Sequence, residues 1–215
     1  IIVINLDIVK INHYDIFMAR SSYHHGNLKE ELVESGIKIL REEGINALSL
    51  RNVARKAGVS HSAPYAHFLD KQALLAAIST RGFHILFQQI DEVSKKYATN
   101  PETLVVEIGW VYCTFAFVEP ALFKLMFSGI LEDEHSYPEF MTAARAPYHK
   151  LVEVVERCQA AGVLPAGLAD RGAVAIWSLV HGFISLYQER QLPGQVLQSA
   201  RLKELLASIL DQLTR

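Results

Sequence analysis

LRNVARKAGVSHSAPYAHF, residues 50–68, decides how the first part of this 215-residue chain folds. Apolar side chains recur there at the spacing of one helix face, at Leu50, Val53, Ala54 and Ala57. Gly58 ends this helix, because glycine adopts positive φ at no steric cost. A second short helix is predicted from Ser60, its N-cap, to about Phe68. Two short helices around a tight turn form a helix-turn-helix, and Ala54 is the small residue that their close crossing needs.

The composition is that of a folded globular protein, with 50% hydrophobic and 20% charged residues and a net charge of −2. The two cysteines, Cys113 and Cys158, lie far apart, which argues against a disulfide framework or a zinc site and fits a reducing cytoplasm. No apolar run approaches the roughly 20 residues that a membrane span needs, so we expect no membrane association. We expect no cofactor and no bound metal.

The first seventeen residues, IIVINLDIVKINHYDIF, are β-branched and differ in character from the rest of the chain. They have neither a basic start nor a small-residue cleavage site, so they do not resemble a secretory signal. Met18 and the residues that follow it resemble the natural start of a protein more closely. We expect residues 1–17 to be a non-native or upstream-encoded extension; the alternative is a genuine N-terminal arm.

After residue 20 the pattern predicts helices throughout and therefore an all-α fold. Asn27 is a plausible N-cap for a helix that ends at Glu43 before Gly44. Asp70 caps a long helix that reaches about Lys95. Further helices are expected near residues 102–118, 120–128, 138–161, 170–190 and 195–213, separated by proline- and glycine-containing breaks. No segment shows sustained period-two alternation.

The predicted helix at residues 61–67 carries an unusual set of side chains for a core element. Ser60, His61, Ser62, Ala63 and Tyr65 gather at its N-terminal end, and Pro64 stands in its first turn, where a missing N–H costs least. Small residues allow a helix end to approach base edges, and hydroxyls and amides bind phosphate oxygens. The pattern favours DNA binding over an ordinary helical hairpin.

The segment GINALSLRNVARKAGVSHSAPYAHFLDKQALLAAI, residues 44–78, resembles the DNA-binding head of the TetR family of bacterial transcriptional regulators. The resemblance rests on the Ala54–Gly58 spacing, the VS pair at 59–60, YAHF at 65–68, and Asp70-Lys71 before Leu74. It implies a three-helix head over residues 18–72 and a ligand-binding and dimerisation body over residues 73–215. It also implies double-stranded operator DNA as the partner.

Carried onto this chain, the resemblance implies a set of DNA contacts. Base edges would be met by His61, Ser62 and Ala63, and backbone phosphates by Ser49, Arg51, Tyr65, His67 and Lys71. Tyr23 would contact the backbone or the minor groove, and Ser60 and Pro64 complete the set of candidate DNA-binding residues. His67 has a second interpretation as a helix-packing residue, and Tyr23 as part of a solvated arm. The predicted recognition helix has no Arg, Lys, Asn or Gln, the usual bidentate base readers, so we expect His61, methyl contacts and DNA shape to provide specificity.

The body resembles a TetR subgroup whose C-terminal domain is named for a Trp–His–Gly pattern, here in WSLVHGF at residues 177–183, with further similarity in WVYCTFAFVEPALFKLMF at 110–127. A small apolar or aromatic effector is expected. The candidate pocket residues are Trp110, Phe117, Met126, Phe127, Tyr148, Trp177 and His181. Most of these are also explained as core residues, and His181 as a satisfied core histidine.

We expect a homodimer through the helices near 170–190 and 195–213, which would present two recognition helices to half-sites about 34–36 Å apart. The function implied is a cytoplasmic repressor that its effector releases from DNA, with activation as the alternative. A helical enzyme is the rival from another class, but P-loop, HExxH and GxSxG motifs are missing. The cluster Glu132 to His135 is better explained as a solvated loop than as a metal site.

Overall fold

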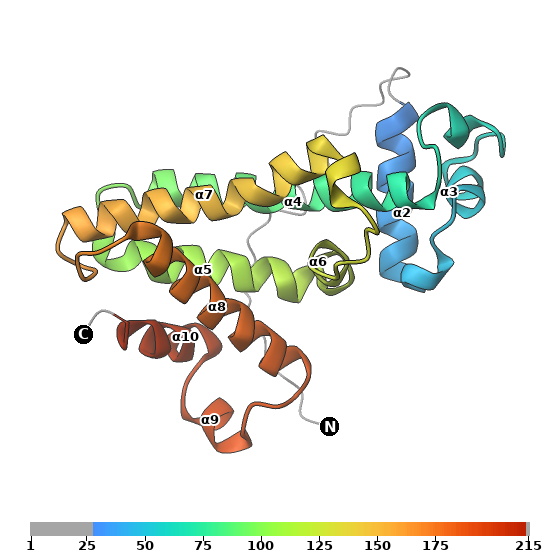
Figure 1. Cartoon of the computed structure of the whole chain (residues 1–215). Helices are drawn as coiled ribbons and strands as arrows, with labels where there is room; N and C mark the ends of the chain where they lie inside the picture. Colours follow the sequence, from blue (N-terminus) through green and yellow to red (C-terminus); the bar gives the residue numbers. More distant parts are fainter. Residues whose placement is uncertain (1–27, 214–215) are drawn as a thin grey trace.

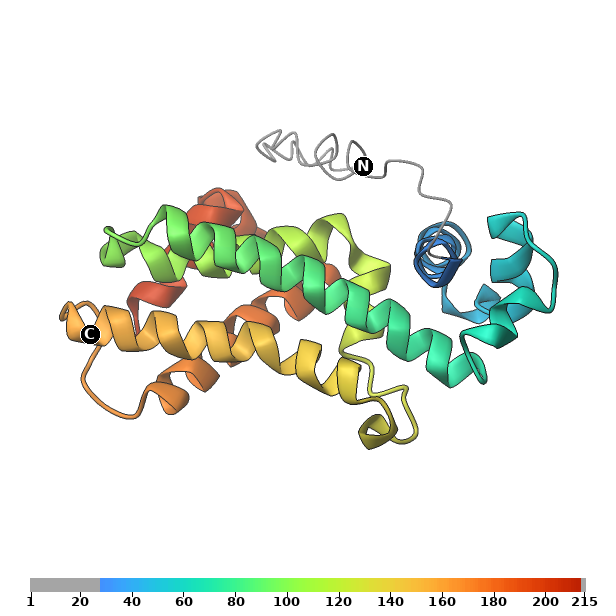
Figure 2. The same cartoon turned by 90° about the horizontal axis from the view of Figure 1, so that it is seen from above.

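The computed structural model describes residues 28–213 and is built from helices alone over that range. Figure 1 shows long helices lying side by side as an elongated body, with a compact helical head at one end. The view from above in Figure 2 shows the same head set apart from the rest of the molecule. The expected extension at 1–17, Tyr23 and the Asn27 cap lie outside the described residues. The all-α prediction is confirmed.

The head is formed by α2 (Leu28–Glu43), the 3₁₀ turn η1 (Ile45–Ala47), α3 (Leu50–Ala57) and the start of α4 (Lys71–Lys96). α3 begins as its sequence predicts, because the Ser49 hydroxyl accepts a hydrogen bond from the Asn52 amide at 3.1 Å. It ends at Gly58, whose φ of 71° is left-handed, and the Val59 amide then bonds the Ala54 carbonyl at 3.0 Å.

The predicted helix at 61–67 is not an α-helix. The chain makes turns at His61 and Ser62 and then one short 3₁₀ element, η2 (Ala63–Ala66). In an α-helix the Ser60 carbonyl would accept from residue 64, but Pro64 has no N–H. The carbonyl accepts instead from the Ala63 amide at 3.0 Å, which tightens the turn to the 3₁₀ pattern.

α4 confirms the predicted long helix and joins head to body. The Asp70 side chain caps it by accepting from the Ala73 amide at 2.8 Å. At Ile78 it packs so closely on α2 that a Cβ added to Gly36 would lie 2.6 Å from the Ile78 Cδ1 atom. A single apolar cluster extends from the head along α4 into the body, so the two parts fold against one continuous core.

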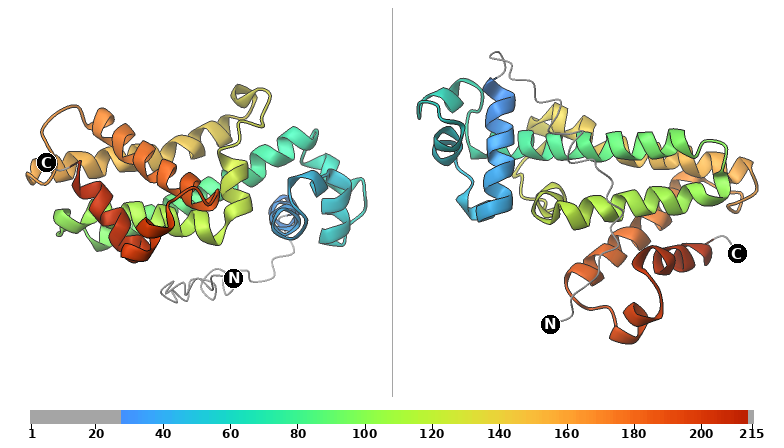
Figure 3. Two further views of the ribbon diagram at one scale, coloured as in Figure 1. Left: turned by 90° about the horizontal axis from the view of Figure 1, so that it is seen from below. Right: turned by 180° about the vertical axis from the view of Figure 1, so that it is seen from behind.

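The body confirms four further predicted helices, α5 (Pro101–Val118), α6 (Pro120–Met126), α7 (Pro138–Ala160) and α8 (Ala169–Gln188). Proline in the first turn opens three of them, because a missing N–H costs nothing there. α4 packs on α5 and α7, and α8 closes the layer against α5 and α7. Figure 3 shows α8 crossing these helices obliquely rather than running along them.

The single helix expected at 195–213 is wrong. The segment forms two helices, α9 (Gly194–Ser199) and α10 (Leu202–Asp211), separated at Ala200, whose backbone is extended. The break lets α10 turn back onto α5, where Leu206 and Leu210 pack beside Gly109. The Glu204 carboxylate accepts from the Arg201 amide at 3.1 Å and stabilises the new start.

α5 corrects the expectation that no run reaches membrane-span length. Among the described residues it is long and apolar enough to cross a bilayer, judged by length and composition alone. In this fold α4, α7, α8 and α10 pack against it, and eight of its 18 residues are buried, among them Leu104, Ile108 and Phe115. Its composition is therefore accounted for by its place as the central helix of the body.

We predict that Gly58→Ala destabilises the protein by about 1–2 kcal/mol, because a Cβ is strained at positive φ. A Cβ at Gly58 would meet no atom within 4 Å, so the cost comes from the backbone alone. Thermal unfolding should shift down by about 2–4 °C per kcal/mol for a chain of this size. Gly167→Ala is the matched control, since its added Cβ is also in open space and its φ is not left-handed. Equal shifts for the two variants would contradict the assignment of strain to Gly58.

Candidate DNA-contacting surface and body pocket

The turn after α3 forms an exposed tip at the end of the molecule remote from α10 (Figure 1). Most of the predicted DNA contacts are exposed there, namely Arg51, Ser60, His61, Ser62, Tyr65, His67 and Lys71. Ser49 and Ala63 are half-buried, and the Ser49 hydroxyl is already engaged as a helix cap. Pro64 is buried, so its ring supports the turn and is corrected from a candidate contact to a packing residue.

Small polar groups define the surface of this tip. The Ser60 and Ser62 hydroxyls lie 3.1 Å apart and share a hydrogen bond, which orients both at the turn. Tyr65 is 62% exposed, which is high for an aromatic side chain and leaves its hydroxyl available to a partner. Phe68 is buried and anchors the turn to the head core. The tip is therefore a rigidly anchored loop whose outer atoms are hydroxyls, imidazoles and methyl groups.

Sequence reasoning missed one residue of this surface. Leu69 is 87% exposed, directly after the buried Phe68 and before the cap residue Asp70. An apolar residue beside YAHF is most simply interpreted as core, so no sequence signal identified it. Its exposure adds an apolar side chain to the edge of the candidate DNA surface.

Ion pairs connect the head to the body. Arg41 of α2 makes a bidentate pair with Glu119 at the start of α6, with Nε and Nη2 each 2.7 Å from a carboxylate oxygen. The Glu119 side chain is only 12% exposed, so water screens this pair less than an open surface pair. Arg81 of α4 bonds Glu34 of α2 at 3.0 Å. α2 is therefore held by ion pairs both to α4 and to the residue before α6.

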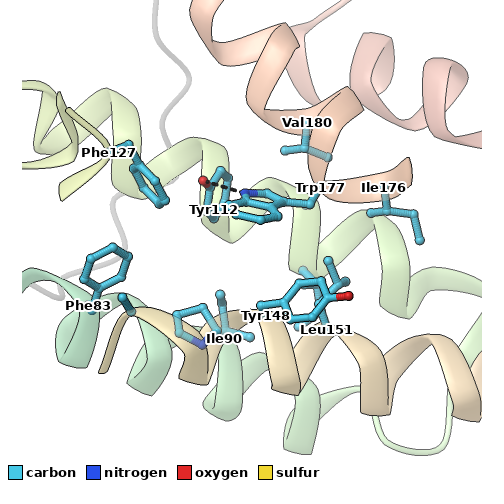
Figure 4. A pocket seen from close by; sticks show the side chains of 13 residues that line it. Phe83, Ile90, Tyr112, Phe127, Tyr148, Leu151, Ile176, Trp177 and Val180 are labelled. Atoms are coloured by element: carbon cyan, nitrogen blue, oxygen red, sulfur yellow. Dashed lines mark hydrogen bonds between the residues drawn. The ribbon is translucent and has the colours of Figure 1, made fainter. Parts of the chain in front are cut away.

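A pocket of about 50 Å³ lies inside the body between α4, α5, α7 and α8 (Figure 4). Its walls are formed almost entirely by apolar and aromatic side chains, from Phe83, Ile90, Ile108, Gly109, Tyr112, Phe127, Ala144, Pro147, Tyr148, Leu151, Ile176, Trp177 and Val180. This lining contains no acidic or basic side chain. A cavity with such walls suits an apolar ligand whose polar group meets a few fixed partners.

The polar groups of the pocket form a chain of hydrogen bonds. The Trp177 indole N–H donates to the Tyr112 hydroxyl at 3.1 Å (Figure 4), and that hydroxyl lies 2.9 Å from Nδ1 of His181. Either the phenol O–H or the Nδ1–H of the imidazole donates this second hydrogen bond, according to the tautomer of His181. Burial lowers the pKa of His181 and raises the pKa of Tyr112 above its usual range. Both groups are therefore uncharged at neutral pH.

Three of the seven residues predicted for the pocket line it, namely Phe127, Tyr148 and Trp177. His181 lies behind them, in ring contact with Phe123 and Phe127, with centroids 5.4 and 5.1 Å away. The prediction missed Tyr112, which is bonded to His181 across 69 positions of sequence and has no local signal.

The other three predicted pocket residues belong elsewhere. The Met126 sulfur lies beside Gly82, filling the contact between α6 and α4. Phe117 packs against Tyr187 near the end of α8, with ring centroids 4.9 Å apart. Trp110 follows the lining residue Gly109 by one position, so its side chain leaves α5 in a different direction and packs against the core cluster.

α8 presents a second surface, which is apolar and uncharged. From Gly172 to Gln188 the helix has no Asp, Glu, Lys or Arg. Val174, Ser178, Gly182 and Leu186 recur every four residues and therefore share one face. Val174 and Leu186 are exposed, and a Cβ at Gly182 would meet no atom within 4 Å. Ile184, in contrast, is fully buried in the core of the chain itself.

The acidic loop before α7 folds as a turn. The Asp133 side chain accepts from the His135 amide at 3.1 Å and the Ser136 hydroxyl at 2.6 Å, which starts the short element η3 (Glu134–Ser136). Over residues 28–213 no three His, Cys, Asp or Glu side chains come close enough to hold a metal ion. The carboxylate of Asp133 is therefore used to stabilise this turn.

Comparison with known proteins identifies both halves of the chain. The family model described as "Bacterial regulatory proteins, tetR family" matches residues 29–78, and "Tetracyclin repressor-like, C-terminal domain" matches 105–213. The HTH-type transcriptional regulator AcrR of Shigella flexneri is 23% identical over 171 residues, which are 76% of this chain and 78% of AcrR.

Two solved structures share the fold. One, of a protein of unknown function from Rhodococcus sp. RHA1, is 29% identical, with a TM-score of 0.75 over 91% of this chain and 100% of that one. The TetR family transcriptional regulator PfmR from Thermus thermophilus is 19% identical, with a TM-score of 0.63 over 86% and 97%.

We predict that His181 makes stability depend on pH. Because burial lowers its pKa in the folded protein, the unfolded chain binds the proton more readily. The stability that comes from keeping His181 neutral is fully present above the pKa of histidine in the unfolded chain, about 6.5. It is lost as the pH falls below that value. Melting curves from pH 8 to 5 should show a smaller loss for His181→Gln, which keeps an acceptor but does not titrate. His84→Gln, an exposed histidine on α4, is the control. Parallel profiles for wild type and His181→Gln would contradict the prediction.

Proposed function

The chain belongs to the TetR family of bacterial regulatory proteins, and on that premise we propose that it is a repressor released from its operator by a small apolar or aromatic effector. Regulators of this family are helix-turn-helix proteins that bind operator DNA and form dimers. The observation that supports effector control is that one chain carries both an exposed polar tip and an apolar pocket, joined by α4 and α6.

The proposed DNA contacts are the exposed residues of the tip. His61 and Ser62 would meet base edges, while Tyr65 and Lys71 would meet phosphates. Ala63 is half-buried, so its methyl group would contact a base only where the turn lies close to the base edges. Because the tip carries no bidentate base reader, we propose that specificity depends on His61, on apolar contacts and on the deformability of the duplex.

The proposed dimer uses the uncharged face of α8, with α10 beside it. Leu186 and Val174 are apolar side chains exposed on one face, and Gly182 between them allows close approach of a second helix. Leu205 and Ile209 of α10 are half-buried and extend this surface. A two-fold axis through the face would pair each residue with its copy and place two tips on one side of the dimer.

The proposed route from effector to DNA passes through α6. Phe127, directly after this seven-residue helix, lines the pocket, and Glu119, directly before it, holds Arg41 of the head. A ligand that displaces Phe127 would tilt α6 and, through the ion pair, α2. Such a ligand binds better to the head orientation that it favours, and by reciprocity it weakens operator binding.

Several finer assignments belong to this proposal. The Trp177–His181–Gly182 pattern suggests the subgroup named for it, and the division at residues 72 and 73 separates head from body. A DNA-binding regulator acts in the cytoplasm, where the chromosome is. A transcriptional activator with the same fold is the second candidate function. Regulators of this family are DNA-binding proteins and not enzymes.

We predict that the protein binds a fragment from upstream of its own gene with an affinity that falls steeply with salt, because phosphate contacts release counterions. His61→Ala should lower affinity about tenfold, the equivalent of ~1.4 kcal/mol, and relax base preference at one position. His84→Ala on α4 is the matched control. A His61→Ala protein with unchanged base preference across a site library would remove His61 from the readout.

We predict that Leu186→Glu converts the dimer to monomers, because a charge would be buried at the proposed two-fold axis. Sedimentation or light scattering should show a halved mass, and DNA affinity should fall at least tenfold, because two half-sites are no longer bound together. Ile130→Glu, which places the same charge on an exposed apolar residue of the α6–η3 loop, should remain dimeric. A dimeric Leu186→Glu protein would exclude this face.

A further inference from the structure

The hydrogen-bond chain in the pocket leaves one site open to a ligand. A phenol oxygen can donate one hydrogen bond and accept two. The Tyr112 hydroxyl accepts from Trp177 and shares a second hydrogen bond with His181, so one of its three hydrogen-bonding positions is left over. Within the described residues no other group bonds this oxygen. A polar group of a ligand can therefore form the third hydrogen bond of the Tyr112 hydroxyl.

The rest of the pocket excludes charge. No acidic or basic side chain lines it, and burial lowers the pKa of His181 behind it, which favours the neutral imidazole. The one carboxylate bonded to a lining residue, that of Asp170, already accepts from the Tyr148 hydroxyl at 3.2 Å. A carboxylate or phosphate entering this cavity would lose its hydration without meeting a cation, which is costly.

The size and walls of the pocket favour a flat, compact ligand. At about 10–15 Å³ for each water, a volume of 50 Å³ holds a few waters, which is closer to one ring than to a long acyl chain. Phe83, Phe127, Tyr148 and Trp177 bring four aromatic rings to the wall, and Tyr148 and Trp177 lie 6.0 Å apart. Rings at such spacings pack favourably, edge or face, with another ring.

We propose that the pocket selects a neutral, single-ring aromatic molecule that forms one hydrogen bond with the Tyr112 hydroxyl, and that it rejects aromatic and fatty carboxylates. This inference rests on the proposed function, because it names the effector class of that same site. Tyr112 is then the specificity residue, with Trp177 and His181 positioning its hydroxyl. Ligands that only fill the cavity bind through the rings and do not use Tyr112.

The test uses the full chain and three probes of matched shape in calorimetric titrations. Para-cresol is a neutral donor, para-xylene replaces its hydroxyl by a methyl group, and para-toluate is an anion. We expect para-cresol to bind about three- to tenfold more tightly than para-xylene, as one net hydrogen bond allows. Para-toluate, and decanoate as a fatty acid, should bind more than tenfold more weakly than para-cresol.

Tyr112→Phe should abolish the preference for para-cresol while para-xylene still binds, which shows that the pocket has kept its shape. Tyr187→Phe is the matched control, since it removes a phenol hydroxyl outside the pocket and should keep the preference. Equal binding of para-toluate, no binding of para-cresol by wild type, or a preference that survives in Tyr112→Phe would each overturn the inference.

Binding of DNA by the same proteins separates this inference from the proposed function. A protein that binds DNA with a steep salt dependence but does not discriminate among the probes would keep its function and lose this effector class. A protein that discriminates among the probes as expected, but binds no DNA, would keep the pocket assignment and lose the regulator role.

Discussion

The close contact between α4 and α6 is the constraint on which the link between the two ends of the molecule depends. At Gly82 the helices lie so near that an added Cβ would be 2.5 Å from the Met126 sulfur. This contact fixes a helix of only seven residues between the pocket and the head. Because α6 has only seven residues and packs closely on α4, the proposed route treats it as a unit that carries a displacement of Phe127 to Glu119.

Uncharged polar side chains have two different places in this protein, one on the exposed tip of the head and one in the apolar pocket of the body. At the tip, exposed hydroxyls and imidazoles of residues 60–67 lie between Arg51 on one side and Lys71 on the other. Inside the body, three polar side chains satisfy one another, which allows an indole, a phenol and an imidazole to remain in apolar surroundings. In both places the chain relies on directed hydrogen bonds, and these favour selectivity over raw affinity.

The position of the dimer face follows from the oblique course of α8. One side of this helix closes the pocket with Ile176, Trp177 and Val180, and the opposite side is left uncharged toward solvent. A second copy on that side would therefore lie one helix away from the ligand. In the proposed dimer, subunit contact and ligand contact would thus be separated by the width of a single helix.

Sequence by itself determined the helical class and most helix ends, because the signals act within a few residues: Ser49 and Asp70 cap, and Gly58 terminates. The 3₁₀ tip was also within its reach, since Pro64 removes the donor that an α-helix needs for the Ser60 carbonyl; the strength of the helix-turn-helix pattern concealed it. The pocket residues were only partly predictable. Aromatic composition pointed to Phe127, Tyr148 and Trp177 but could not separate them from Phe117 or Met126.

Tertiary structure alone decided the break at Ala200 and the partnership of Tyr112 with His181. The break is set by where α10 can pack on α5, beside Gly109, and local helix propensity across residues 195–213 does not contain that information. The bond between Tyr112 and His181 joins positions 69 apart, and it exists because α5 and α8 cross at one particular angle and height. Helical periodicity states which side of each helix is buried, but the crossing geometry decides which buried side chains meet.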